Sequence, residues 1–207
     1  MIAIVDYGLG NLRSVQYALD RLGRPCVLTA DAGAVASADG VILPGVGAFE
    51  RAMANLRDLR LVKVLRDTAS SGRPLLGICL GLQLLFETSD EHGRHEGLGI
   101  LPGQVVRFGA GLTVPHMGWN QVAQAGASPL FESVPDGAYF YFAHSFYARP
   151  ADADTAIGRT DYGEPFASVV ARGSVFAAQC HPEKSGPTGL TMLSNFCRLC
   201  QGGDHAG

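Results

Sequence analysis

The sequence lacks any long hydrophobic run. Hydrophobic residues make up 47% of its 207 residues, yet none of their runs approaches the roughly 20 residues that a membrane-spanning helix needs. Residues 1–6 also carry no basic segment, and their apolar run is too short for a secretory signal. We therefore expect a soluble, cytoplasmic protein that does not bind membranes.

Concentrated charge is also missing. Charged residues are only 17% of the chain, the net charge is −3, and the basic residues are spread along it, so no footprint for nucleic acid is present. We find no repeat, low-complexity block or linker. The length suits one domain, which we expect over residues 1–201, with a flexible tail over 202–207.

The five cysteines have no disulfide-framework spacing. Cys197 and Cys200 form a C-x-x-C pair, but a zinc site needs about four ligands and no second pair stands nearby. The pair continues an apolar helical stripe, which favours buried packing. No His/Cys/Asp cluster has metal-ligand spacing, so we expect neither metal nor cofactor.

In the first half, short apolar runs alternate with amphipathic stretches, a pattern that predicts a parallel sheet with helices on both faces. The expected strands and helices, in chain order, are strand 2–5, helix 12–22, strands 26–29 and 41–43, a helical region 49–70, strand 74–78 and helix 80–87.

The second half contains short strands separated by many turns, which we expect to form hairpins appended to the same sheet. The expected strands are residues 105–108, 139–142, 155–159, 166–172 and 175–179, and a closing helix follows over 188–200.

The segment G-I-C-L-G at residues 77–81 follows a buried strand and opens a helix, as a nucleophile elbow does. Cys79 then sits at a helix N-terminus, where the helix dipole favours the reactive thiolate. The amide of Leu80 is free to face a developing oxyanion. The alternative is a small buried cysteine between packing glycines. The strand–turn–helix context favours the nucleophile.

An apolar strand ends in H-P-E at residues 181–183. In an extended segment, side chains two residues apart point the same way, so Glu183 can hold one ring nitrogen of His181 while the other faces the thiol. Alone, this would indicate a surface histidine near a loop glutamate. Together with Cys79, it predicts a catalytic triad for amide hydrolysis.

The loop P-G-V-G at residues 44–47 follows an earlier strand of the predicted sheet. Its end should lie on the same edge as Cys79, so its amides are candidates for a second oxyanion donor. Phosphate binding is the alternative, but the segment lacks both the dinucleotide pattern and the Walker lysine.

These motifs together resemble the class I, triad-type glutamine amidotransferases, which hydrolyse glutamine to glutamate and ammonia through a thioester. The resemblance implies a single-domain, flavodoxin-like α/β fold with a mostly parallel sheet, flanking helices and appended β-hairpins. It implies oxyanion amides at Gly47 and Leu80, and a substrate site at Gln83, Ser145 and Phe146.

A narrower resemblance rests on P-H-M-G-W-N at residues 115–120, together with residues 6–12, 139–145 and 181–186. These are similar to the glutaminase subunits of imidazole glycerol phosphate synthase and span nearly the whole chain. Cys180 departs from the family's usual aromatic residue. The resemblance implies a (β/α)8-barrel cyclase partner in a heterodimer, to which ammonia passes for synthesis of imidazole glycerol phosphate and aminoimidazole carboxamide ribotide in histidine biosynthesis.

The chain has no room for a second, ammonia-using domain, which also favours a separate partner. The interface candidates are Asn11, Met117, Trp119, Tyr139 and Lys184. Three alternatives stay open: a glutaminase serving another synthase, such as the one that makes pyridoxal phosphate; a regulatory module without activity; and a papain-like peptidase, whose motif spacing fits poorly.

Overall fold

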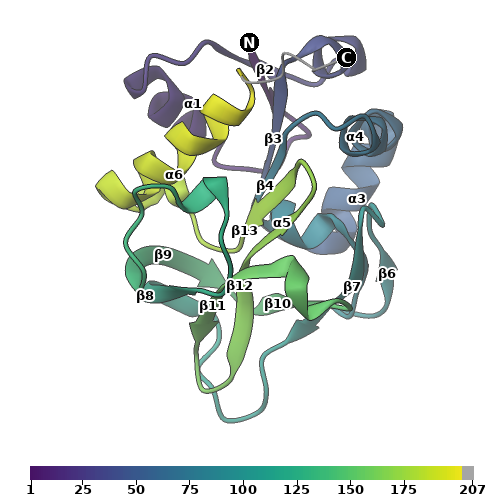
Figure 1. The fold of residues 1–207 in the computed structure, drawn as a ribbon. Coiled ribbons are helices and arrows are strands. Elements are labelled where there is room, and N and C mark those ends of the chain that lie inside the picture. The colour runs from purple at the N-terminus through teal and green to yellow at the C-terminus, as the bar shows by residue number, and fades with distance from the viewer. Residues whose placement is uncertain (202–207) are drawn as a thin grey trace.

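The computed structural model of the chain describes residues 1–201. A nine-stranded sheet forms its centre, with helices packed on both faces of its parallel half (Figure 1). The strands of this sheet, in spatial order, are β2 (Cys26–Thr29), β1 (Ile2–Val5), β3 (Gly40–Gly45), β4 (Leu75–Cys79), β13 (Val175–Ala178), β12 (Pro165–Arg172), β11 (Ala156–Asp161), β8 (His116–Gln124) and β9 (Ala138–His144).

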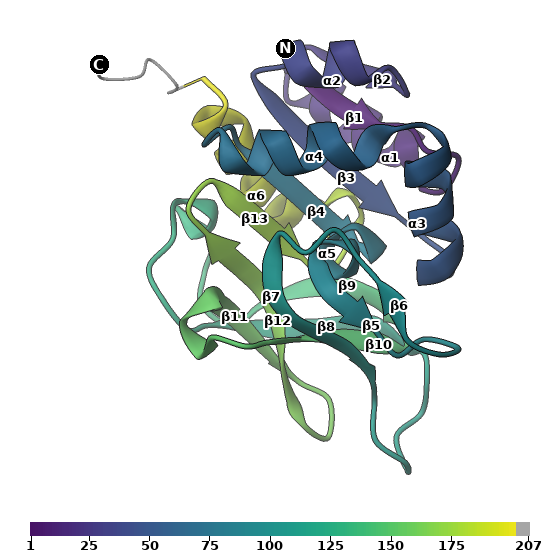
Figure 2. The same cartoon turned by 90° about the vertical axis from the view of Figure 1, so that its right-hand side faces the viewer.

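The strands from β2 to β13 pair in parallel, and those from β13 to β9 pair antiparallel. A second, four-stranded sheet lies beside the antiparallel half (Figure 2). Its strands, in spatial order, are β10 (Phe146–Pro150), β7 (Leu101–Arg107), β5 (Phe86–Ser89) and β6 (His95–Glu96). The predicted α/β class is confirmed, but the appended strands are divided between two sheets.

The helices divide between the two faces of the parallel half. Helices α1 (Leu12–Arg21) and α6 (Gly186–Leu199) cover one face, and the other four lie on the opposite side (Figure 1). Those four are α2 (Ala32–Ser37), α3 (Phe49–Asp58), α4 (Leu61–Ser70) and α5 (Leu80–Leu84). No helix within residues 1–201 is long and apolar enough to cross a membrane.

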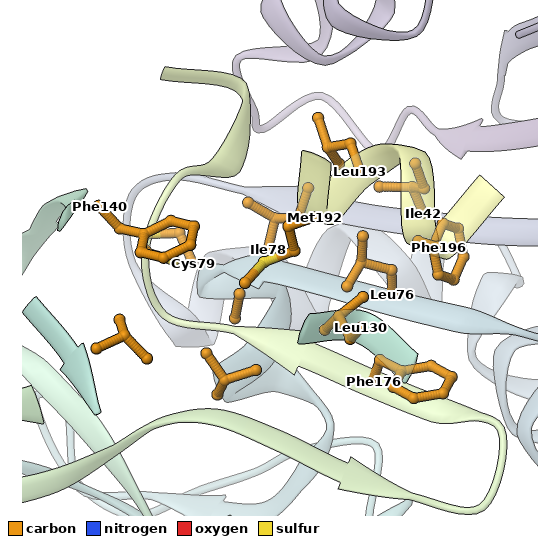
Figure 3. Close-up of a cluster of buried hydrophobic side chains, with 14 of the residues drawn as sticks. Ile42, Leu76, Ile78, Cys79, Leu130, Phe140, Phe176, Met192, Leu193 and Phe196 are labelled. Carbon is orange, nitrogen blue, oxygen red and sulfur yellow. The ribbon is translucent and has the colours of Figure 1, made fainter. Parts of the chain in front are cut away.

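Alternation along the strands builds two cores. In β1, Ile2 and Ile4 pack toward α1 and α6, whereas Ala3 and Val5 pack toward the opposite helices. Figure 3 shows the first core, in which apolar side chains of β3, β4 and β13 meet α6, with Cys79 at its margin. Both cysteines of the C-x-x-C pair are buried here, as predicted.

The helical region expected over 49–70 is confirmed and consists of two helices, because Arg60 takes a left-handed conformation with φ 57° and breaks the run. One helix prediction was wrong in extent. The helix expected over 80–87 ends at Leu84. Residues from Phe86 onward form β5, where pairing with β7 outweighs local helix preference.

The structure contains four strands that the sequence pattern did not predict: β5, β6, β8 and β10. In β8 the apolar residues Met117 and Trp119 are exposed, which hides the usual alternation. The expected tail, residues 202–207, lies outside the described residues, so the division at residue 201 stays a prediction.

Candidate active site

The carboxyl ends of the parallel strands bring the predicted motifs together. Gly45, at the end of β3, pairs in register with Cys79, at the end of β4, and Ala178 of β13 pairs with Ile78 on the other side. The P-G-V-G loop, the cysteine elbow and the H-P-E segment therefore leave the sheet at the same edge.

Cys79 has the strained backbone of a nucleophile elbow. Its φ of 55° and ψ of −111° place it outside the regions that a non-glycine residue ordinarily adopts. It directly precedes α5, so Leu80 is the first helical residue, with its amide at the helix N-terminus. The turn is tight enough to present the thiol at the strand end.

Three glycines allow this turn to form. A Cβ on Gly81 would overlap the carbonyl oxygen of Leu43, and one on Gly45 would overlap the hydroxyl of Tyr7. A Cβ on Gly77 would lie 2.8 Å from the oxygen of Gly81. Strand β3, strand β4 and α5 can approach this closely only because these positions carry no side chain.

His181 and Glu183 form a buried pair beside Cys79. The Nδ1 atom of His181 lies 2.8 Å from Oε1 of Glu183, and the two side chains are 3% and 1% exposed. The extended geometry predicted for this segment is wrong. His181 caps a 3₁₀ turn over Pro182–Lys184, and this turn folds the glutamate back onto the ring.

The surroundings of His181 favour its charged form. Burial alone lowers the pKa of the imidazole, but hydrogen bonding to Cys79 and to Glu183 outweighs burial and raises the pKa to about 10. The ring nitrogen that faces away from Glu183 is therefore suited to hold the proton of the Cys79 thiol.

A cavity of about 320 Å³ lies over these residues. That volume is within the range of small-molecule sites. Glu183 lies behind His181 and does not line the cavity. The predicted site and interface residues that line it are Gly47, Cys79, Leu80, Gln83, Met117, Ser145, Phe146, His181 and Lys184.

Gln83 joins α5 to the segment after β9. Its Nε2 donates to the carbonyl of Phe146 at 2.9 Å and to Oε1 of Gln179 at 3.1 Å. Its Oε1 accepts no hydrogen bond from residues 1–201 and is the atom left for a ligand. Gln83, Ser145 and Phe146 thus form one wall of the cavity.

Sequence reasoning assigned no catalytic or substrate-binding role to three further residues at the site. Glu91 lines the cavity, and its carboxylate accepts the amide of Phe49 at 2.6 Å. Gln179 is fully buried against Cys79, and His144 lines the cavity below Phe146. Glu91 stands in a polar stretch that resembles a loop. Gln179 is a polar residue within the apolar run before His181, and this break in the pattern is a sequence signal for a buried polar contact near the site.

His144 belongs to a buried pair with His116. Nδ1 of His116 lies 3.0 Å from Nε2 of His144, whose own Nδ1 lies 2.8 Å from the Phe146 carbonyl. Burial lowers the pKa of His116 to about 4 and that of His144 to about 3, so both rings are neutral near pH 7. The pair is a structural support beneath the cavity.

Three interface candidates share one exposed face of β8 and β9. Met117, Trp119 and Tyr139 are 64%, 56% and 56% exposed, unusually high for large apolar side chains in one place. The Lys184 ammonium lies 5.8 Å from the Tyr141 ring on the same pair of strands. Asn11 precedes α1, which contacts the 3₁₀ turn that carries Lys184.

Comparison with known proteins agrees with this geometry. Residues 3–200 match the family described as glutamine amidotransferase class-I. The chain is 54% identical over 206 residues to the "Imidazole glycerol phosphate synthase subunit HisH" of Moorella thermoacetica, covering 100% of this chain and 98% of the relative. It is 50% identical to the protein of that name from Aquifex aeolicus, covering 96% of each.

Solved structures share the fold at lower identity. One described as a glutamine amidotransferase superposes with a TM-score of 0.77 at 20% identity, covering 97% of this chain and 100% of that one. The structure of PurLQS from Thermotoga maritima gives a TM-score of 0.72 at 19% identity, covering 95% of this chain and 97% of that one. On its sequence match, this chain belongs to the class I glutamine amidotransferase family.

Proposed function

We propose that this chain is the glutaminase subunit of imidazole glycerol phosphate synthase. It hydrolyses L-glutamine to L-glutamate and ammonia and passes the ammonia to a (β/α)8-barrel cyclase subunit in a heterodimer. The complex makes imidazole glycerol phosphate and aminoimidazole carboxamide ribotide in L-histidine biosynthesis. The observation that carries this proposal is that Cys79 and His181 line one cavity, with Glu183 paired to His181 behind it, in a chain about half identical to subunits of that synthase.

The reaction begins when the Cys79 proton moves to the free ring nitrogen of His181. The thiolate attacks the side-chain amide carbon of glutamine, and the amides of Gly47 and Leu80 hold the resulting oxyanion. Each such donor is worth about 3 kcal/mol of barrier. His181 then protonates the leaving nitrogen, ammonia departs, and a thioester remains. Water, activated by His181, releases glutamate, while Glu183 keeps the ring oriented throughout.

The cavity wall supplies contacts for the rest of the substrate. Gln83 Oε1 and the backbone at Ser145 and Phe146 are available to the amino acid. The carboxylate of Glu91 lies on the opposite side, in the loop after β5, where it can face an α-ammonium group. These contacts favour a free amino acid over a peptide, because a peptide bond would remove that positive charge.

The exposed face around Trp119 is where we place the cyclase. Met117 and Lys184 line the cavity, and Met117 also belongs to that face, so ammonia formed at Cys79 has a short route toward a docked partner. Trp119 and Tyr139 have the size and polarity of interface anchors. Asn11 can add a polar contact from the start of α1, which packs against the turn that carries Lys184. A cytoplasmic location stays a prediction from the sequence.

Reconstitution with the barrel subunit tests the proposal. The purified chain is mixed with that cyclase, its ribonucleotide substrate and glutamine, and both glutamate and imidazole glycerol phosphate are measured. We expect them in equal amounts. The chain could instead release glutamate without forming imidazole glycerol phosphate and support a different synthase, such as the pyridoxal phosphate enzyme. That result would show that the cyclase is not its partner. If no complex releases glutamate, the chain is not a glutaminase and a regulatory role is the remaining alternative.

A further inference from the structure

Gln179 is a fully buried polar residue in direct contact with the sulfur of Cys79. It follows β13 and its backbone amide donates to the Ser168 carbonyl at 2.8 Å. Its side-chain Nε2 lies 3.8 Å from Cys79 Sγ, and its Oε1 accepts from Gln83 at 3.1 Å. A buried amide needs a structural or chemical reason, because burying it without partners costs free energy.

The hydrogen-bond network fixes which end of this amide faces the sulfur. A carbonyl oxygen can only accept, so the Phe146 carbonyl requires Gln83 to present its Nε2. The second hydrogen on that nitrogen points to Gln179 Oε1. Gln179 is thereby left with its NH₂ group toward Cys79, and the reverse orientation would place two acceptors or two donors against each other.

The Phe146 carbonyl is itself held in place by a second donor. His144 donates to it through Nδ1 at 2.8 Å, and the Nε2 atom of the same ring faces His116. The acceptor at the start of the network is therefore bound from both sides, by a histidine and by Gln83. The orientation of Gln179 is set by packed structure rather than by a free rotamer.

Besides the ring of His181, Cys79 Sγ meets one acceptor and one further donor in its buried surroundings. The carbonyl of Ala143 lies 3.9 Å away and suits a neutral thiol, which can donate to it. Once the proton moves to His181, that carbonyl oxygen faces a negatively charged sulfur and can no longer accept a hydrogen bond from it. The Gln179 N–H then becomes the favourable contact, because a hydrogen bond to an ionised group is stronger than one to a neutral group.

We propose that Gln179 is a catalytic hydrogen-bond donor that stabilises the Cys79 thiolate, and that Gln83 and the Phe146 carbonyl hold it in the donating orientation. The inference rests on Cys79 being the nucleophile. The thiolate is then stabilised by two groups, the imidazolium of His181 and the amide of Gln179. The Gln179 contact acts before substrate binds, and again when the thioester breaks and the thiolate returns.

The test replaces Gln179 by methionine, which keeps similar volume and loses the donor. The purified chain is treated with iodoacetamide across a pH series, and alkylation of Cys79 is followed by peptide mass spectrometry, with buried Cys180 as an internal reference. We expect Gln179→Met to react about tenfold more slowly at pH 7 and its reaction midpoint to move to higher pH.

Gln124→Met is the matched control. It removes another amide hydrogen bond, from Gln124 Nε2 to the Val134 carbonyl at 2.8 Å, at a position remote from the cavity. This variant should alkylate at the wild-type rate. In the complex with the cyclase, Gln179→Met should lower kcat for glutamine with little change in KM, because the amide contacts the sulfur and not the substrate.

The proposal is overturned if folded Gln179→Met, with the wild-type thermal midpoint, keeps both the wild-type alkylation rate and its pH midpoint. Should this variant fail to fold, Gln179→Asn provides the same test, since it retains an amide that is one methylene too short to reach the sulfur. A wild-type Cys79 that reacts no faster than Cys26 would instead contradict the nucleophile assignment, and this proposal with it.

Discussion

The imidazole of His181 and the carboxylate of Glu183 meet at 2.8 Å inside the protein, only two residues apart in the chain. Glu183→Gln keeps the shape of the side chain and removes its charge, so the ring loses its orienting acceptor and the stabilisation of its imidazolium form. We expect kcat for glutamine in the synthase complex to fall by about ten- to a thousandfold.

Glu50→Gln is the corresponding control. The Glu50 carboxylate lies 4.0 Å from Nε2 of His95, but its side chain is 70% exposed and neither residue lines the cavity. This variant should keep wild-type turnover. An equal loss of kcat in both variants would show that Glu183 does not act by orienting His181.

The raised pKa of His181 predicts a stability change at alkaline pH. Its value of about 10 in the folded chain lies above the ordinary 6.5, so the native state holds this proton more tightly than the unfolded state does. The stabilisation is complete below pH 6.5 and disappears as the pH rises toward 10. The part of the shift that Glu183 causes adds to stability, whereas the part that Cys79 causes is offset, because the thiol loses the proton that the ring gains. We expect the free energy of unfolding to fall by about 1–3 kcal/mol over that range.

Urea unfolding at several pH values measures this effect. His181→Gln cannot be protonated and should show a flatter profile between pH 6.5 and 10. The exposed His92 provides a control, because His92→Gln should keep the wild-type slope. Identical slopes for wild type and His181→Gln would contradict the raised pKa.

Gly81 tests the steric basis of the elbow. Alanine ordinarily stabilises a helix relative to glycine by about 1 kcal/mol, yet a Cβ at Gly81 would overlap the Leu43 carbonyl oxygen. We therefore expect Gly81→Ala to destabilise the fold by about 3 kcal/mol or more, seen as a lower thermal midpoint. Gly126→Ala, where no atom lies within 4 Å of the new Cβ, should leave the midpoint nearly unchanged.

Trp119 tests the assigned partner face. Trp119→Ala should weaken binding to the cyclase subunit by about 2 kcal/mol, or roughly thirtyfold, in isothermal titration calorimetry. Tyr17 on α1 is 66% exposed, so Tyr17→Ala removes a comparable aromatic ring from a different surface and should not change the affinity. If Tyr17→Ala weakens binding and Trp119→Ala does not, the interface lies elsewhere.

The first half of the fold was predictable because its signals are local. Buried parallel strands give continuous apolar runs, and helices α1, α3 and α4 repeat apolar residues at helical spacing. The second half was less predictable. Strand β8 exposes Met117 and Trp119, and β5 follows α5 with a single residue between them, so pairing with distant strands decides both.

The candidate site shows the same division. Cys79 and the H-P-E segment stood out because each combines a reactive side chain with a strand end. Glu91 and Gln179 did not, since their positions depend on which loop folds over the cavity and on a network that runs through Gln83. Short motifs identify groups that react, whereas residues that hold those groups are defined by three-dimensional packing.

The most direct measurement of the central claim uses Cys79→Ala in the complex with the cyclase. The variant lacks the sulfur that forms the thioester but keeps the partner face and the cyclase intact. We predict that imidazole glycerol phosphate forms at the wild-type rate from added ammonium salts and does not form from glutamine. Glutamine-dependent formation by this variant would contradict the account.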